Sequence, residues 1–420
     1  MAGGATPKAE EKELYYSNDP DTGIPFIRVQ NLSTNGELDL SDAKLINRDT
    51  HNGLLARSHV LEDDLLIKIT GVGRMAVSAV PPKGFEGNIN QHIVRAKTRS
   101  RVESRTLAAF LNTDIGEALA TRRATGGTRP ALDHPALRSI PIIYNEAILR
   151  LVDEANERRK SALDKAEALL ASIDSYLLAE LGIAPAPEPE NTIENRIFRT
   201  KASEVIGLRF DARAYQYDFN LRSEVYPNVR LATVCAVNPK TVFRGLTKAD
   251  EVSFVPMDAI SDRLGIVERH ETRILVENVS YTSFQNGDLL WAKITPCMEN
   301  GKSAVAENLH NGFGYGSTEY HVLRSPDHRL DISYLHSLLR MKRVRKAAVR
   351  FFTGSSGHQR VDADFLKALE FPLAPIDLQR SLAREARARV AEAGRLEIEA
   401  NAELERTKLE IEALLLGDAA

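Results

Sequence analysis

Apolar residues recur every three or four positions in two long stretches of the chain. The first stretch, residues 145–181, has no glycine or proline, and the second covers residues 377–416. Most positions between the apolar ones are charged, which predicts long helices with one apolar seam that pack as a coiled coil. The seam comprises Ile148, Val152, Ala155, Ala162, Ala166, Leu170, Ile173 and Leu177 in the first stretch, and Leu382, Ala386, Val390, Ala393, Ala400, Leu404, Ile411 and Leu415 in the second.

The segment before each helix has a different pattern. The stretches DLLIKIT (64–70) and DLLWAKIT (288–295) are typical of strands, and turn signals such as Asn-Gly-Asp at 286–288 separate them from their neighbours. Residues 107–124 and 333–352 have helical patterns. Each globular part is therefore expected to be α+β.

The two globular parts match each other. At an offset of 225 residues, the first copy shares Asp63/Asp288, Leu65/Leu290, Lys68/Lys293, Ile69/Ile294, Thr70/Thr295 and a closing Ser-Ala-Val with the second. Four further matches follow in the same order: 24–33 with 252–261, 90–95 with 319–324, TGGTRP (125–130) with TGSSGH (353–358), and Ile140-Pro141-Ile142 with Phe371-Pro372-Leu373. A period above 200 residues indicates duplicated domains. The expected division is a domain at 1–144, a helix at 145–182, a Pro-rich linker at 183–194, a domain at 195–375 and a helix at 376–420.

Charge and composition add limits. The formal net charge is −3, but residues 195–375 hold 25 Lys and Arg against 20 Asp and Glu, whereas residues 376–420 hold 7 against 10. A basic domain and an acidic helix fit a domain that binds nucleic acid and a helix that binds protein. Two cysteines exclude a disulfide framework, and no signal peptide or transmembrane run is recognisable, so a reducing cytosol and no membrane partner are expected.

The sequence shows no catalytic motif. Gly301-Lys302-Ser303 resembles a phosphate-binding loop, but Pro296 stands where that loop needs a glycine, so a turn between strands is expected. The stretch GFGYG (312–316) lacks the rest of a dinucleotide-binding unit, so a surface loop is expected. No zinc-ligand spacing, Ser/His/Asp set or Asn/Asp-Pro-Pro-aromatic segment is found, so we expect a protein that is not an enzyme and holds no metal or cofactor.

Polar and basic residues in matching places are the candidates for DNA contacts. Thr, Ser and backbone amides suit phosphates, while Arg, Asn, Gln and His can reach base edges. The alternative is a solvated helix face or, for His92 and His321, a buried structural histidine. In the first copy the candidates are Lys68, Thr70, Asn88, Asn90, Gln91, Arg122, Arg123, Thr125, Thr128 and Arg129. In the second they are Lys293, Thr295, Lys302, Ser317, Thr318, Tyr320, Lys342, Arg343, Arg345, Lys346, Arg350, Ser355, Ser356, His358, Gln359 and Arg360.

With these motifs, nearly the whole chain resembles the specificity subunit of type I restriction–modification systems. The resemblance rests on GIPFIRVQNLS (23–33), the paired DLL…KIT strands, residues 125–142 and 353–383, IDSYLLAELG (173–182) and LRFDARAY (208–215). It implies two target-recognition domains for a bipartite double-stranded DNA site and two antiparallel spacer helices. The implied partners are adenine-methyltransferase subunits and nuclease/translocase subunits, which would hold S-adenosylmethionine, ATP and Mg²⁺.

The two copies differ in length before their aligned segments. The second copy has about 50 residues before its aligned segment and the first about 20, with no match to LRFDARAY, so the first domain is expected to lack its opening segment. The alternatives to a specificity subunit are the recognition component of another phage-defence complex, or a coiled-coil adaptor whose basic domains bind protein or RNA.

Overall fold

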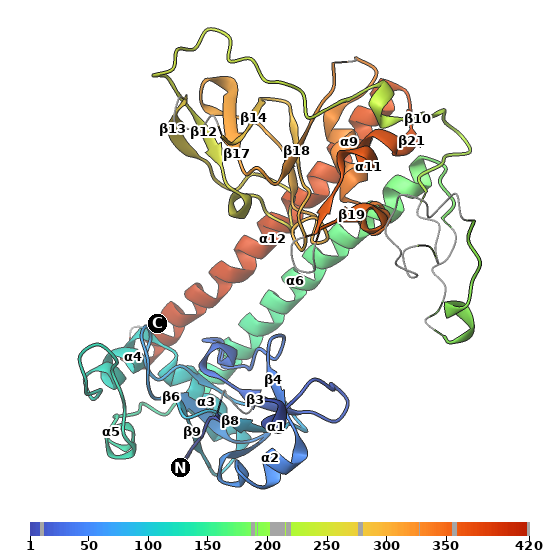
Figure 1. Cartoon of the computed structure of the whole chain (residues 1–420). Helices are drawn as coiled ribbons and strands as arrows, with labels where there is room; N and C mark the ends of the chain where they lie inside the picture. Colours follow the sequence, from blue (N-terminus) through green and yellow to red (C-terminus); the bar gives the residue numbers. More distant parts are fainter. Residues whose placement is uncertain are drawn as a thin grey trace. The chain divides into compact units, whose positions relative to one another are not determined.

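The chain forms two compact units. The computed structural model describes residues 1–8, 12–185, 190, 192–201, 215, 220–275, 280–326, 328–354 and 359–417. The first unit contains residues 1–164 and 396–420, and the second contains residues 165–395 (Figure 1). Two long helices, α6 (Ala147–Glu180) and α12 (Ile376–Leu416), each contribute residues to both units.

Two sheets build the first unit. One has the strand order β2–β4–β3–β8–β5, and the other has the order β1–β9–β6–β7. Strands β3 and β8 run parallel, and the other pairs are antiparallel. The bounds are β1 Ala2–Gly3, β2 Tyr16–Ser17, β3 Ile24–Ile27, β4 Lys44–Ile46, β5 His59–Leu61, β6 Leu65–Lys68, β7 Ser78–Ala79, β8 Glu86–Ile89 and β9 Ile93–Ala96.

The second unit repeats this topology. Its two four-stranded sheets have the orders β13–β12–β17–β14 and β11–β18–β15–β16, again with one parallel pair, β12 and β17, and the strand pairs β10–β21 and β19–β20 also belong to the unit. Strand β11 takes the place against β18 that β1 takes against β9. The bounds are β10 Asn228–Arg230, β11 Ala236–Val237, β12 Glu251–Val255, β13 Glu271–Ile274, β14 Thr282–Gln285, β15 Leu289–Ala292, β16 Ser303–Val305, β17 Phe313–Gly316, β18 Tyr320–Arg324, β19 Phe352–Thr353, β20 Arg360–Val361 and β21 Glu370–Pro372. The predicted duplication of an α+β domain is confirmed.

Short helices lie among the strands of the first unit and follow the sheets in both units, and capping side chains mark where several of them begin. Thr113 accepts the amide of Gly116 at the start of α4, and Asp133 and Asp362 cap α5 and α11 in equivalent places. The bounds are α1 Lys12–Tyr15, α2 Arg48–Asn52, α3 Arg101–Leu111, α4 Asp114–Thr121, α5 His134–Arg138, α9 Ile332–Arg340, α10 Lys342–Ala348 and α11 Ala363–Ala368.

The two long helices run antiparallel inside each unit. In the first unit, Ile148 and Ile411 share one core, and Arg158 Nε lies 2.6 Å from a carboxylate oxygen of Glu403. In the second unit, Leu177 and Leu382 share a core, and Arg389, Ser172 and Tyr176 pack together. None of the predicted seam residues is exposed, so the predicted antiparallel helix pair is confirmed.

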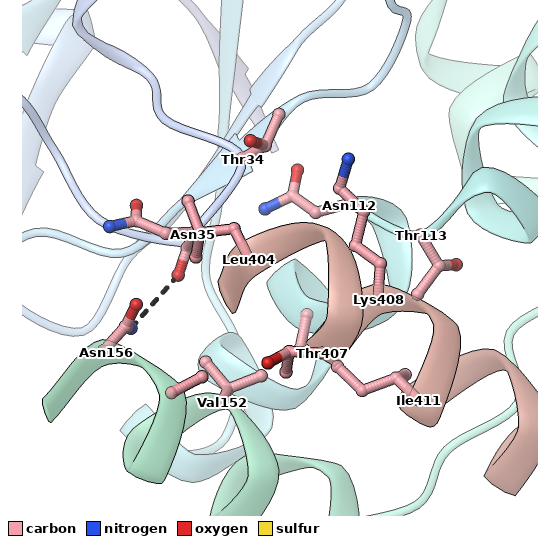
Figure 2. Close-up of a pocket in the computed structure, with 12 residues that line it drawn as sticks. Thr34, Asn35, Asn112, Thr113, Val152, Asn156, Leu404, Thr407, Lys408 and Ile411 are labelled. Carbon is pink, nitrogen blue, oxygen red and sulfur yellow. Dashed lines mark hydrogen bonds between the residues drawn. The ribbon is translucent and has the colours of Figure 1, made fainter. Parts of the chain in front are cut away.

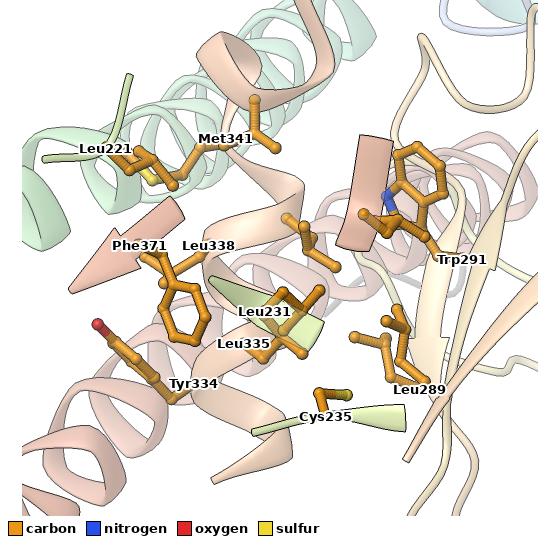
Figure 3. Packing of buried hydrophobic residues seen from close by; sticks show 14 of the residues in the cluster. Leu221, Leu231, Cys235, Leu289, Trp291, Tyr334, Leu335, Leu338, Met341 and Phe371 are labelled. Carbon is orange, nitrogen blue, oxygen red and sulfur yellow. The ribbon is translucent and has the colours of Figure 1, made fainter. Parts of the chain in front are cut away.

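Each unit has its own hydrophobic core. In the second unit Trp291, Tyr334 and Phe371 are fully buried (Figure 3). The hydroxyl of Tyr334 donates to the carbonyl of Pro372 at 2.7 Å. In the first unit a small cavity of about 30 Å³ lies between α3, α6, α12 and the loop around Asn35. Asn156 donates to the carbonyl of Asn35 at its edge, which joins that loop to the helix pair (Figure 2).

One sequence prediction is corrected by the sheet. The stretch GFGYG is the buried strand β17 with its flanking residue, and is not a surface loop. A Cβ at Gly314 would come within 2.6 Å of the Phe284 ring, and one at Gly316 within 2.5 Å of the Val255 carbonyl. These glycines therefore allow close packing inside the sheet.

The alignment of the two copies also shifts by one residue. Leu66 pairs with Ala79 on the neighbouring strand, and Leu290 pairs with Ala304. The amide of Leu132 donates to Ile69, whereas the amide of Val361 donates to Lys293. The equivalent offset along β6 and β15 is therefore 224, so the shared Lys-Ile-Thr letters occupy backbone positions that differ by one.

Within the described ranges, no helix combines the length and apolar character that crossing a membrane requires.

Candidate nucleic-acid interface

Two loops of the first unit lie against each other. One follows β6 and covers residues 69–77, and the other is the Thr-Gly loop at 125–131. Thr70 bridges to Ala131, and the amide of Gly71 donates to the carbonyl of Pro130 at 3.3 Å. Thr125 and Ala131 exchange backbone hydrogen bonds of 2.9 and 2.8 Å, which close the Thr-Gly loop. The predicted Thr70 and Thr125 are thus brought together.

Lys68 supports the first of these loops from inside the protein. Its side chain is buried, and Nζ donates to the carbonyls of Val72 and Arg74 at 2.8 and 2.9 Å. Burial lowers the pKa of Lys68, and the nearby Glu117 carboxylate opposes that shift. Lys68 therefore shapes the loop and is left out of the interface that we propose.

Arg74 fixes the same loop from the other side, and sequence reasoning missed it. Its guanidinium lies 2.7 Å from Asp114 and 2.8 Å from Glu117, and donates to the carbonyl of Asn112. Both carboxylates lie in the first turn of α4 and attract the guanidinium by their opposite charge. The two glycines beside Arg74 were the available signal for an unusual loop.

The remaining candidates of the first unit divide by exposure. Arg123 turns back and donates to the carbonyl and hydroxyl of Ser139. Asn88 is fully buried and bonded to His51, Leu55 and Ser58, and the side chain of buried Asn90 accepts the amide of His92. Asn88 and Asn90 therefore have internal partners and are also left out. The exposed candidates are Gln91, Arg122, Thr125, Thr128 and Arg129.

The second unit brings together three equivalent segments. The amide of Lys293 donates to the carbonyl of Glu319 at 2.9 Å, and the amide of Thr295 donates to the carbonyl of Gln359 at 2.9 Å. Ile294 bridges to Arg360, as Thr70 does to Ala131 in the first unit. Lys293, Thr295, Ser317, Gln359 and Arg360 are partly exposed, and Thr318 is exposed.

A two-point ion pair holds this group. The Arg360 guanidinium donates to both Glu319 carboxylate oxygens at 2.8 Å. These hydrogen bonds lower the pKa of Glu319, and the charges of Arg360 and Lys293 act in the same direction. Glu319 begins the matched segment 319–324, but its partner Arg360 is 41 residues away and no local pattern indicates the pair.

The basic segment 340–350 is partly structural. Arg340 donates to the carbonyls of Gly301, Asp262 and Arg263, and burial lowers its pKa to about 10. Arg345 donates to the carbonyls of Arg340 and Glu299, so it also supports the loop before β16. Substitution of Arg345 would therefore disturb packing as well as charge.

An aspartate of α6 anchors this segment. Asp174 accepts the amide of Lys342 at 3.0 Å. Burial raises the pKa of Asp174, while that hydrogen bond and the arginines of the segment oppose the shift. Lys342 is exposed, and Arg343, Lys346 and Arg350 are partly exposed, with the Arg350 guanidinium 5.1 Å from the Tyr215 ring.

Two further candidates of the second unit have partners inside the protein. Lys302 Nζ donates to the carbonyls of Met257 and Ile260 at 3.1 and 3.0 Å, which agrees with the expected turn between strands. Tyr320 is buried and its hydroxyl donates to Pro256. His321 is buried too, which is the structural alternative given for it above, and it bonds to the carbonyl of Val361.

Some predictions fall outside the described residues. They are Ser355, Ser356 and His358, and nearly all of LRFDARAY at 208–215. Across the ranges that are described, no group of three or more His, Cys, Asp or Glu side chains could hold a metal ion.

Comparison with known proteins now adds to this geometry. The chain is 33% identical over 148 residues, 35% of its length, to the specificity subunit of the type I restriction enzyme EcoEI of Escherichia coli. It is 33% identical over 153 residues to the corresponding EcoAI subunit of the same organism. The chain resembles type I specificity subunits.

This resemblance, predicted from the sequence, is thereby confirmed. A solved structure described as the basis of complex assembly and conformational transition of the type I system has a chain of similar fold, with a TM-score of 0.54 and 14% identity over 99% of this chain and 94% of that one. The match spans about a quarter of the length of the two curated subunits. No family model matches the chain.

Proposed function

We propose that this protein is the sequence-specific DNA-recognition subunit of a type I restriction–modification complex, and is not itself an enzyme. The observation that carries the proposal is the repeated loop pair. In each unit the segment after a buried strand bridges to the Thr-Gly segment, at Thr70–Ala131 and at Ile294–Arg360. The first pair presents the hydroxyls of Thr125 and Thr128 and the guanidinium of Arg129. The second presents Thr295, Gln359 and Arg360, and such groups suit phosphates and base edges.

Two units with equivalent loop pairs suit a bipartite double-stranded target, with one half-site for each unit. The helix pair would then join the two recognition units and bind adenine-methyltransferase subunits. Methyl transfer with S-adenosylmethionine, and any ATP-driven cleavage, would belong to partner subunits in a prokaryotic cytoplasm. The names of the matched relatives, which are specificity subunits of type I restriction enzymes, support the recognition role within such a system.

Selection from a random DNA library tests the proposal. The full chain, purified with the subunits that accompany it, should enrich a two-part sequence and prefer it over unrelated DNA by roughly 10³-fold at moderate salt. Arg129→Ala should relax selection at one half-site and Gln359→Ala at the other.

The control is Arg57→Ala, because Arg57 is exposed but lies outside both loops. Binding that falls steeply with salt and enriches no sequence would contradict the proposal. That result would favour a non-specific nucleic-acid binder.

A further inference from the structure

The loop after β6 carries an exposed valine at its apex. Val72 leaves 78% of its surface exposed, whereas Met75, Ala76 and Val77 of the same loop are buried. Burying an aliphatic side chain is favourable, so an isolated exposed one contributes little to its own fold. The surroundings of Val72 therefore decide what it can do.

The two residues beside Val72 adopt backbone conformations that favour glycine. Gly71 and Gly73 have φ values of 114° and 80°, which residues with a Cβ atom rarely adopt. Lys68 Nζ binds the carbonyl of Val72 itself and that of Arg74. The carbonyl of the apex is thus bound by the protein while its isopropyl group stays in solvent.

Two further contacts attach the loop after β6 to its neighbours. Arg74 is clamped by Asp114 and Glu117, at 2.7 and 2.8 Å. The amide of Gly71 donates to Pro130, in the Thr-Gly loop. The valine apex is therefore held next to a second loop whose Thr125, Thr128 and Arg129 are exposed.

An aliphatic side chain beside hydroxyl and guanidinium groups matches a surface of DNA that is partly polar and partly apolar. Hydroxyls and a guanidinium suit phosphates and polar base edges, but an aliphatic group needs an apolar partner. In the major groove the C5 methyl group of thymine is the apolar feature that reports sequence. We infer that Val72 is a specificity-determining residue that packs against a thymine methyl in the half-site of the first unit. The inference rests on the DNA-recognition function proposed above.

The test replaces each thymine of the selected half-site by deoxyuridine, which lacks only that methyl. Affinities are measured for the full chain in its complex, as wild type and as Val72→Ala, at one salt concentration. At one position the replacement should weaken wild-type binding roughly four- to tenfold, the size expected for one buried methyl contact. Val72→Ala should bind the thymine site more weakly by a similar factor, and deoxyuridine should then cost it nothing further.

Val102→Ala is the matched control, because Val102 is 45% exposed at the far end of α3 from Arg74's partner Asn112. It should behave as wild type. Equal binding by Val72→Ala and wild type, or losses from variant and deoxyuridine that multiply, would overturn the role of Val72 while DNA recognition stands. Absence of any sequence preference in the wild type would instead overturn the proposed function and this inference together.

Discussion

Several lysines and arginines of this protein donate hydrogen bonds to backbone carbonyls inside the fold. Lys68 and Lys302 each donate to two backbone carbonyls, and Arg340 donates to three. A buried carbonyl without a partner is costly, so such cations stabilise loops that have few regular backbone hydrogen bonds. The basic character of these segments is thus partly used inside the fold.

Lys68→Met should lower the free energy of unfolding of the first unit by about 2 kcal/mol or more. The methionine fills similar space but leaves the carbonyls of Val72 and Arg74 without their donor. Chemical denaturation followed by circular dichroism measures the change. Lys97→Met is the control, since Lys97 is exposed, and equal stability of the two variants would show that the buried ammonium is dispensable.

The sequence indicated which polar and basic residues lie near the loops, but it did not show which of their side chains are exposed. Thr125, Thr128 and Arg129 are exposed in a loop, as a contact residue must be, whereas Asn88 and Tyr320 are buried. The difference depends on which face of a strand a residue occupies, and a shift of one residue reverses that face. The two copies differ by such a shift along β6 and β15, and the identical Lys-Ile-Thr residues made the sequence alignment miss it.

Among the elements, helix α9 is attached to strand β16 by a histidine. His336 Nε2 lies 3.2 Å from both the carbonyl and the hydroxyl oxygen of Ser303. Burial lowers the pKa of His336 to about 3, and the charge of Arg340 acts in the same direction. The folded protein therefore keeps this histidine neutral where an unfolded chain would protonate it.

This gives a pH dependence with a definite sign. Because the folded pKa lies below the unfolded value near 6.5, the contribution of His336 is complete above pH 6.5 and is lost as pH falls toward 3. The slope from this group is at most about 1.4 kcal/mol per pH unit. Denaturation curves of His336→Gln between pH 7 and 4 should show a shallower decline than those of wild type.

His321 provides the comparison, because burial lowers its pKa as well and it should keep part of the slope in the variant. An unchanged slope in His336→Gln would mean that His336 does not titrate differently on unfolding.

The elements themselves were largely predictable. The long helices follow from apolar spacing alone, because each seam continues over many turns. Strand β17 was missed because its glycines resemble a loop, and the explanation is the close packing of the Phe284 ring against Gly314 and of the Val255 carbonyl against Gly316. A neighbour that is distant in sequence cannot be recognised from a local pattern.

At the scale of the whole molecule, the helix pair is common to both units. Helix α6 has 34 residues, which at ~1.5 Å per residue gives about 51 Å. The units divide between residues 164 and 165 on α6, and between 395 and 396 on α12. If the helices set the spacing of a bipartite site, that spacing depends on their length and not on the recognition loops.

A matched insertion tests this directly. Seven residues added at both division points should lengthen the helix pair by ~10 Å, which is about three base pairs of B-DNA. Selected sites should then gain about three base pairs between unchanged half-sites. Unchanged spacing would rule out the helices as a ruler, and an insertion in α6 alone is a control because it breaks the antiparallel register.

The offset of 224 residues between the strands β6 and β15 has a practical consequence for hybrid proteins. Exchange of loops between the two halves would ordinarily be cut at the shared Lys-Ile-Thr letters. At such a junction Lys68, whose ammonium is buried, would take the place of Lys293, which is the backbone equivalent of Ile69. Every following side chain would then point to the opposite face of the strand. Joints placed at Leu66 and Leu290, and again at Leu132 and Val361, keep equivalent hydrogen bonds together. The side chains of a transplanted loop would then point to the same face of the sheet as in the original unit.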